Sequence, residues 1–510
     1  MKKILFGMLI VGLAAQSCTK VNENVYDKLA ATEFDATPAG AQDELASIYG
    51  QITGTWSSNY AGRDNCWYDL NEFSSDEQYV PHRSDGNWGL DDAQLYLRTE
   101  PTSLAALSNT WNWNYGAVYD ENAAIAALTA AKAPAADIAE AHVARDWNYW
   151  LLIDDFGDVP YYTTNDAASL KAGQTKRAVI YANIVADLKA NVDLLSTTKG
   201  GAYYGRFNKW AGYMVLAKIY LNAAVYTAST PGASDGTPQW QAALDACNTI
   251  ASGGFTLHPA TANTTSLLGN TYFDLFGDVC PNDETILALS LTENVISGNI
   301  YTIRSLNTAN GTAVLGYAGW DGTVIPEDFY NTYDPSDIRA KQFLVGPQAL
   351  GGNTYTPTVL ESIIDPGAGI NEGIRDVKFY PVAPIDASGS SNDFPIYRYA
   401  DVLLMQAECE LRLGNAAAAA PYLNQVRERV GLADIAAPTL TDVYNERGRE
   451  LNMEGHRRQD MIRFGTYLQA HGVAPNTVPA MSNTYLLFPI PTSVLSASPQ
   501  LSQNPGYPKS

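Results

Sequence analysis

Two segments of the chain combine aromatic rings with side chains that carry planar hydrogen-bonding groups. A sugar offers C–H faces that stack on a ring and hydroxyls that pair with carboxylate, amide or guanidinium groups. The first segment, residues 76–88, offers Asp76, Glu77, Tyr79, Arg83, Asn87 and Trp88. The second, residues 317–322, offers Tyr317, Trp320 and Asp321, with Gly319 and Gly322 expected to leave the rings accessible. We predict a glycan-binding platform at these residues. The alternative is that the rings fill the junction between loops and helices.

Paired carboxylates would suit glycoside hydrolysis, which needs two carboxyls about 5 to 9.5 Å apart across the sugar bond. The neighbouring acidic pairs here are Asp91–Asp92, Asp154–Asp155 and Asp283–Glu284. Adjacent residues on a helix or strand point their side chains apart, so no pair predicts a catalytic centre. The five histidines are isolated, and no nucleotide-binding or triad motif occurs. We expect no enzyme and no organic cofactor. An all-α secreted glycoside hydrolase stays as an alternative.

One turn-like stretch gathers the hard oxygen ligands that calcium prefers. The sequence GDVCPNDE contains Asp278, Asn282, Asp283 and Glu284. Carboxylate and carbonyl oxygens bind Ca²⁺ in proteins, although this spacing is not that of an EF-hand loop. These four residues form a candidate structural calcium site, and an acidic turn without a metal is the alternative.

Charged residues are also dense between residues 446 and 463, at spacings of three and four. Such spacings put side chains on neighbouring helix positions, where ion pairs form. We interpret this cluster as structural, because it would lock the C-terminal helix onto the rest of the fold. Thr439, followed three residues later by Asp442, is a good helix start. The cluster consists of Glu446, Arg447, Glu450, Glu454, Arg457, Arg458, Asp460 and Arg463.

The composition excludes one class of partner. The 510 residues carry 54 acidic and 32 basic side chains, a formal net charge of −22. A nucleic-acid partner is therefore not expected, because few cations are present to neutralise phosphates. The 31 tyrosines and 10 tryptophans suit recognition of a neutral, hydroxyl-rich ligand, or alternatively a core with aromatic helix seams.

The N-terminus has the pattern of a secretion signal. Lys2 and Lys3 precede an apolar run, residues 4–15, that is too short to span a bilayer comfortably. Cys18, directly after the small Ser17, looks like the lipidated first residue of a bacterial lipoprotein, and a plain secretion signal is the alternative. Residues 1–17 would be removed and residues 18–37 would tether the fold to the membrane. The other four cysteines show no C-x-x-C spacing, so zinc and redox sites are not indicated.

Apolar residues recur every three to four positions over most of the chain, so the fold is predicted to be mostly α. Between two of the helices lie only Gly414, expected in the left-handed conformation that ends a helix, and Asn415, expected as an N-cap. Tight hairpins of this kind build tetratricopeptide-like arrays. The helices are expected over residues 39–50, 111–131, 135–155, 178–195, 209–226, 240–251, 398–413 and 416–430.

Two stretches differ in kind from the helical array. Residues 56–92 and 285–387 are rich in Gly, Asn, Asp, Ser and Thr, and they are expected to form loops with a few strands. Binding residues commonly lie on loops that a helical scaffold positions. Trp56, Tyr60, Trp67 and Tyr68, in the first stretch, are therefore candidates for an exposed binding surface.

Motifs along the chain, in order, carry a family resemblance. They are FGDVP, IVADLKANVDLL and GRFNKWAGYMVLAKIYLNAAVY, then RYADVLLMQAECELRLGN, LNQVRERVGL, ERGRELNMEGHRRQDMIRFG and FPIPTSVLSASPQLSQNPGY. Together they resemble the RagB/SusD family, the surface glycan-binding lipoproteins of Bacteroidetes. The resemblance implies one SusD-like domain over residues 38–510, with the helical array mainly in 38–284 and 395–470 and ligand-facing loops in about 285–394 and 56–92.

The same resemblance implies a function and a location. It implies non-catalytic binding of an oligosaccharide or polysaccharide at the outer-membrane surface, on the side facing the cell exterior. It also implies delivery of the ligand to a SusC-like TonB-dependent transporter. A peptide- or other-ligand-binding helical-repeat lipoprotein of a nutrient import system stays as the other alternative.

Overall fold

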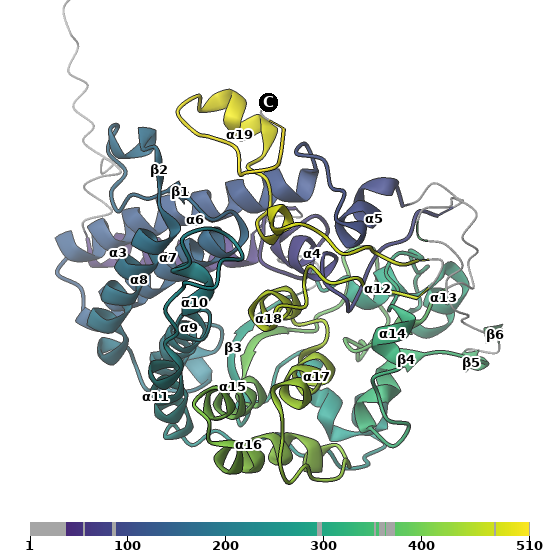
Figure 1. Cartoon of the computed structure of the whole chain (residues 1–510). Coiled ribbons are helices and arrows are strands. Elements are labelled where there is room, and N and C mark those ends of the chain that lie inside the picture. The colour runs from purple at the N-terminus through teal and green to yellow at the C-terminus, as the bar shows by residue number, and fades with distance from the viewer. Residues whose placement is uncertain are drawn as a thin grey trace, which may run out of the picture.

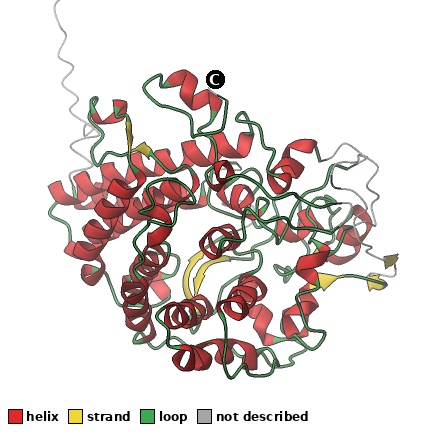
Figure 2. Cartoon of the chain, in the orientation of Figure 1, coloured by secondary structure: helices red, strands yellow, loops and turns green. Residues whose placement is uncertain are grey.

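The fold is mostly α-helical, as predicted (Figure 1). The computed structural model describes residues 37–54, 57–83, 88–292, 298–350, 353–355, 363, 373–473 and 476–508. The predicted signal segment 1–17, Cys18 and nearly all of the predicted tether lie outside these residues, as do Trp56 and Asn87. Figure 2 shows the few short strands as small pieces among the helices.

Eight helices form one continuous array in which each helix packs on the next. Figure 1 shows them following one another around the left and lower parts of the molecule. Helix α11 packs directly on α15, although the long loop-rich stretch separates them in sequence. The helices of the array are α3 (Pro38–Thr53), α6 (Ala105–Ala130), α7 (Ala135–Asp155), α8 (Arg177–Asn191), α9 (Lys209–Leu221), α11 (Trp240–Ala251), α15 (Tyr399–Arg412) and α16 (Ala416–Arg429).

The hairpin of α15 and α16 shows which local signals hold. Gly414 has φ +87°, and its N–H donates to the carbonyl of Leu411, so it ends α15 as predicted. The prediction of Asn415 as a side-chain N-cap is wrong. Its amide instead donates to the carboxylate of Glu410 at 3.0 Å.

Helix α6 also begins earlier than predicted, at Ala105, and α9 ends earlier, at Leu221.

Aromatic residues of the first loop-rich stretch lie in the core. Tyr60 and Trp67 are 2% exposed, and their rings stack at 4.5 Å. The Tyr60 ring also packs on that of Trp147 of α7 at 5.1 Å, and Tyr68 is fully buried. The prediction that these rings form an exposed surface is therefore wrong, because they seal the inner face of the array.

The second loop-rich stretch leaves and rejoins the array at neighbouring strands. Strand β3 (Thr285–Leu289) pairs antiparallel with β8 (Phe394–Arg398), with Thr285 opposite Arg398 and Leu289 opposite Phe394. Figure 1 shows the residues between them gathered on the right of the molecule. Their elements are α12 (Tyr301–Ser305), α13 (Thr308–Leu315), α14 (Glu327–Tyr330), η6 (Ile338–Gln342), β4 (Phe343–Leu344), β5 (Gln348–Leu350), β6 (Asn353–Tyr355) and β7 (Arg375–Asp376).

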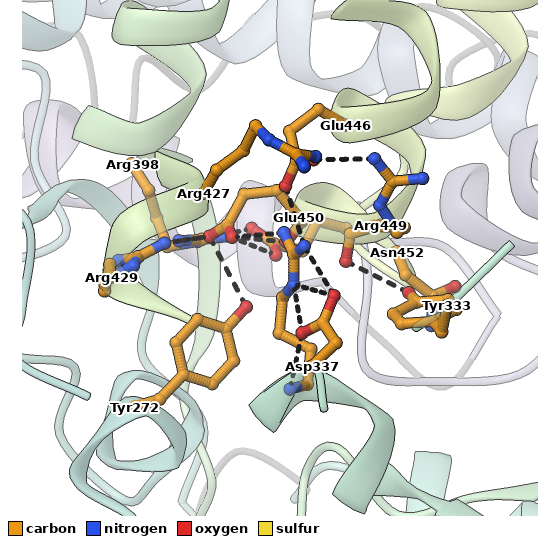
Figure 3. A network of polar contacts seen from close by, with 12 residues as sticks. Tyr272, Tyr333, Asp337, Arg398, Arg427, Arg429, Glu446, Arg449, Glu450 and Asn452 are labelled. Atoms are coloured by element: carbon orange, nitrogen blue, oxygen red, sulfur yellow. Dashed lines mark hydrogen bonds and ion pairs between the residues drawn. The ribbon is translucent and has the colours of Figure 1, made fainter. Parts of the chain in front are cut away.

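Buried ion pairs join this loop-rich part to the C-terminal helix α17 (Leu440–Leu451), which is followed by α18 (Arg457–Phe464). The fully buried Glu450 pairs with Arg339 at 3.0 Å and Arg398 at 2.9 Å, and also with Arg429. Figure 3 shows the Arg398 and Arg429 side chains meeting at Glu450, with Arg427 and Arg449 beside Glu446. The structural interpretation of this cluster is confirmed, but most pairs join different elements rather than neighbouring turns of one helix.

The remaining elements are short. They are α4 (Trp67–Glu72), α5 (Leu90–Leu97), β1 (Val159–Pro160), η1 (Ser169–Lys171), β2 (Gln174–Thr175), η2 (Val192–Leu194), η3 (Gly201–Tyr203), α10 (Ala223–Tyr226), η4 (Leu267–Gly269), η5 (Thr271–Phe276), η7 (Asn483–Leu486) and α19 (Thr492–Ala497). Among the described residues, no helix combines the length and the apolar character that crossing a bilayer requires.

Candidate ligand-binding site

The two aromatic segments singled out from the sequence meet in the structure. The Tyr79 N–H donates to the Val324 carbonyl at 3.1 Å, and the Val324 N–H donates back to the Tyr79 carbonyl at 2.9 Å. Beyond this bridge, the indole N–H of Trp88 donates to the carbonyl of Trp320 at 2.7 Å. Two stretches more than two hundred residues apart therefore form one unit. We call the half-buried rings of Trp88, Trp320 and Tyr317 the aromatic platform.

Glycines determine how closely the two segments approach. A Cβ atom added to Gly322 would lie 2.7 Å from the Trp88 ring, so the indole lies directly over this glycine. A Cβ atom on Gly319 would lie 2.2 Å from the carbonyl oxygen of Leu306. The expectation that these glycines keep the rings accessible is therefore wrong. They allow close packing of a ring and of a backbone instead.

Buried charged residues hold the backbone next to Trp320 in place. Asp321 is 6% exposed and has φ +55°, a left-handed conformation that is uncommon for a non-glycine residue. The Arg83 Nε–H donates to its carbonyl at 2.9 Å, and Arg375 pairs with its carboxylate at 2.5 Å. Tyr79 is also buried, with its ring 4.6 Å from that of Tyr96. In this arrangement Tyr79, Arg83 and Asp321 hold the platform, and they cannot touch a ligand without rearrangement.

Asp76 has a different role from the one predicted for a ligand contact. Its carboxylate forms a two-point ion pair with Arg457 of α18, at 2.6 and 2.9 Å. Burial disfavours the charged carboxylate, but the Arg457 guanidinium outweighs burial and holds the pKa of Asp76 below its usual value. Asp76 therefore ties the first segment to the C-terminal helices.

Sequence reasoning missed a second group of charges beneath the platform. Arg304 is fully buried and pairs with Asp64 and Asp69, each at 2.9 Å. Its carbonyl accepts from the Gly322 N–H at 2.7 Å, which links this group to the platform. Burial and the nearby Asp64 carboxylate raise the pKa of Asp92 to about 6. No sequence signal joins Arg304 to Asp64, because their contact arises only from the tertiary fold.

Comparison with known proteins identifies the family. The family model described as "SusD family" matches residues 321–507, and the model described as "Starch-binding associating with outer membrane" matches residues 37–221. The chain belongs to the SusD family. The first match begins at Asp321, directly after Trp320, and the second match includes Trp88.

Relatives and solved structures of the SusD family span most of the chain. SusD-like protein P25 of Formosa agariphila is 27% identical over 83% of both chains. The starch-binding protein SusD of Bacteroides thetaiotaomicron is 25% identical over 72% of both chains. Surface glycan-binding protein A of Bacteroides thetaiotaomicron, solved with laminarihexaose, has a TM-score of 0.70 at 19% identity, covering 92% of this chain and 99% of its own. A SusD-like protein of Bacteroides fragilis has a TM-score of 0.71 at 17% identity, covering 93% and 98%.

The candidate calcium ligands do not converge. Within the described part of the chain, no three His, Cys, Asp or Glu side chains gather into a group that would hold a metal ion. Glu284 is fully buried and pairs with Arg398 and Arg429, each at 2.6 Å. Asp283 instead contacts the His258 ring at 2.9 Å. The structure therefore gives no support to the predicted calcium site.

The acidic pairs considered for hydrolysis have other partners. Asp154 accepts hydrogen bonds from the Tyr226 hydroxyl at 2.7 Å and the Gln459 amide at 3.1 Å. Asp155 is fully buried, and burial raises its pKa to about 8. Asp91 and Asp92 lie in the first turn of α5, three and four residues after Trp88. Of these acids, only Asp91 and Asp92 lie beside the aromatic platform.

Two cavities lie away from the platform. A largely apolar groove of about 530 Å³ runs between α3, residues 204–206 and strand β3. A second cavity of about 420 Å³ lies between the residues after α10 and the end of α18, with Asp154 and Arg177 in its wall. Neither cavity contains a residue of the predicted glycan site.

Proposed function

We propose that this SusD family member binds an oligosaccharide or polysaccharide at the outer-membrane surface without catalysing a reaction. The observation that carries the proposal is the joining of Trp88 and Trp320 into one platform by the 2.7 Å hydrogen bond. Both tryptophans are half-buried, while the neighbouring Arg83 and Asp321 are bonded within the protein.

The platform suits a sugar for physical reasons. A pyranose ring stacks its C–H face on an indole and buries apolar area without losing its hydroxyl contacts. The hydrogen bond that the Trp88 indole donates to the Trp320 carbonyl holds this indole before a ligand arrives, and such preorganisation lowers the entropy cost of binding. The solved relative with laminarihexaose supports this ligand class, since its fold matches over 92% of this chain.

The location and the partner are also part of the proposal. Cys18 would carry the lipid anchor, and the model described as "Starch-binding associating with outer membrane" supports that address. We infer that this protein faces the cell exterior. Its helical array would contact a SusC-like TonB-dependent transporter, which receives the glycan. Co-purification of such a transporter with the tagged protein from membranes would test this part. If the complex requires the lipid anchor, Cys18→Ala should abolish the co-purification.

Affinity electrophoresis tests the ligand-binding part. The protein from Thr19 onward is run through gels that contain different neutral polysaccharides, beside Trp88→Ala and Trp320→Ala. Removing either ring should raise the dissociation constant derived from the retardation by about tenfold or more, because stacking area is lost. Tyr119→Ala is the matched control, since it removes a 47% exposed ring from α6. Retardation that survives both tryptophan substitutions would refute the platform.

A peptide ligand is the second candidate, favoured by the apolar groove beside β3. This strand has β8 as its one strand neighbour within the described residues, and residues 287–289 of the strand line the groove. Exposed strand edges accept extended peptides through backbone hydrogen bonds. If no polysaccharide retards the protein and Leu289→Arg abolishes binding of a peptide mixture, the peptide function replaces the glycan function.

A further inference from the structure

The stretches that build the platform have an unequal distribution of accessible charge. Residues 57–98 and 298–330 contain no lysine. The described arginines in these stretches are all buried, at 2% exposure or less. They are Arg63, Arg83, Arg98 and Arg304. Arg375, which pairs with Asp321 from β7, is also fully buried. The one histidine, His82, is half-buried.

The accessible charges beside Trp88 are carboxylates. Asp91 is exposed and Asp92 is half-buried, both in the turn of α5 that follows Trp88. Asp64 has a side chain that is 20% exposed, and it reaches the platform through Arg304. The Arg304 Cγ and the Trp88 ring lie at 3.0 and 2.7 Å from the same point above Gly322. Burial, with a smaller contribution from the Asp64 carboxylate, raises the pKa of Asp92 to about 6.

The structure assigns to this site a preference for uncharged glycans, with Asp91 and Asp92 as the specificity-determining residues. This inference rests on the proposed function. Both carboxylates would accept hydrogen bonds from sugar hydroxyls, and charge-assisted hydrogen bonds of this kind are stronger than neutral ones. The same carboxylates would repel the carboxylate of a uronic acid or the sulfate of a sulfated sugar, and no accessible cation in the described parts of these stretches offsets them.

Helix structure alone does not explain this arrangement. Acidic residues in a first helical turn are favoured by the positive end of the helix, so Asp91 and Asp92 also suit α5. The helix, however, does not require that all the arginines be buried. Repulsion between exposed charges is screened over about 8 Å at physiological salt, so the discrimination should also depend on ionic strength.

A matched pair of ligands gives the sharpest test. A neutral polysaccharide that retards the purified protein is compared with its own carboxymethyl derivative, which differs in charge but not in backbone. The wild-type protein should bind the carboxymethyl form at least about tenfold more weakly at low salt, with a smaller gap at 0.5 M NaCl. Asp91→Asn/Asp92→Asn should narrow the gap severalfold. Asp245→Asn, which removes an exposed charge from α11 across the molecule (Figure 1), should leave the gap unchanged.

Each outcome has a distinct meaning. Equal or tighter binding of the carboxymethyl form by the wild type overturns the charge preference and leaves the proposed function in place. A gap that the double variant leaves unchanged overturns the role of Asp91 and Asp92. Failure to bind any polysaccharide, neutral or acidic, overturns the proposed function and this inference together. The single variant Asp91→Asn changes only an exposed side chain, so it serves if the double variant does not fold.

Discussion

At the scale of single residues, the site depends on a glycine as much as on its rings. Gly322 lies under the Trp88 indole, and its missing side chain makes room for the ring. The Trp88 indole N–H then reaches the Trp320 carbonyl, which fixes the orientation of the Trp88 ring. Gly322 is thus a positioning residue for the platform.

Substitution of this glycine should disturb binding more than folding. In Gly322→Ala the new Cβ would meet the indole at 2.7 Å, so the ring must move and the hydrogen bond to Trp320 must lengthen. We expect about a tenfold loss of glycan affinity by isothermal titration calorimetry, with a small change in melting temperature. Gly173→Ala is the control, because its Cβ would meet nothing within 4 Å. Unchanged affinity in Gly322→Ala would show that the Trp88 orientation does not matter.

Residue types revealed the two segments of the site but not the role of each member. Trp88 and Trp320 stood out as aromatic residues in turn-rich sequence, and the structure joins them. The same reasoning also selected Tyr60 and Trp67, which are buried in the core. The difference arises from tertiary packing, since Trp147 of α7 supplies a surface for Tyr60 and no such helix covers the Trp88 ring fully. Local sequence does not encode that difference.

At the scale of elements, helix existence was more predictable than helix ends. The bounds of α7 and α11 match the predicted ranges 135–155 and 240–251. Helix α6, by contrast, begins at Ala105, six residues before its predicted start at Trp111. Periodicity reports a buried face, whereas the end of a helix depends on capping partners that lie elsewhere in the fold.

Helix α17 offers a direct test of one such cap. The Thr439 hydroxyl accepts from the Asp442 N–H at 3.3 Å, and the Thr439 N–H donates to the Asp442 carboxylate at 2.8 Å. Thr439→Ala should lower the free energy of unfolding by about 1 kcal/mol, measured by chemical denaturation. Thr439→Ser keeps the hydroxyl and should cost much less. Equal losses in the two variants would contradict a hydrogen-bonded cap.

At the scale of the whole molecule, buried charges connect the array, the loop-rich part and the C-terminal helices. Arg398 of β8 pairs with Glu284, just before β3, with Glu450 of α17 and with Glu454 shortly after that helix. Removing one partner from such a network leaves a buried charge uncompensated and is strongly destabilising. The same network was visible in the sequence only as charges at helical spacing, because its partners lie in distant segments.

The carboxyl groups of Glu72 and Glu77 behave differently from this network. Both are almost fully buried, at 0% and 1% exposure. Burial raises the pKa of Glu72 to about 7, and burial together with the Glu72 charge raises the pKa of Glu77 well above its usual value. Between the unfolded value of about 4.3 and pH 7, the folded protein therefore binds more protons than the unfolded chain. Each such proton makes the free energy of unfolding fall by about 1.4 kcal/mol per pH unit as pH rises.

This pair should make the protein more stable at mildly acidic pH than at neutral pH, and one substitution tests the cause. In Glu77→Gln the like charge is gone, and the amide is free to donate to Glu72 while its oxygen still accepts from the Met453 N–H. The substitution removes the titration of residue 77, whose raised pKa makes the folded protein bind a proton, and the amide replaces the hydrogen bond that the protonated Glu77 donates to Glu72. Denaturation measured from pH 4.5 to pH 7.5 should show a clearly flatter stability curve for Glu77→Gln than for the wild type. Asp43→Asn, an exposed change on α3, should reproduce the wild-type slope. Parallel curves for Glu77→Gln and the wild type would show that other buried acids, such as Asp155 and Asp376, set the pH dependence instead.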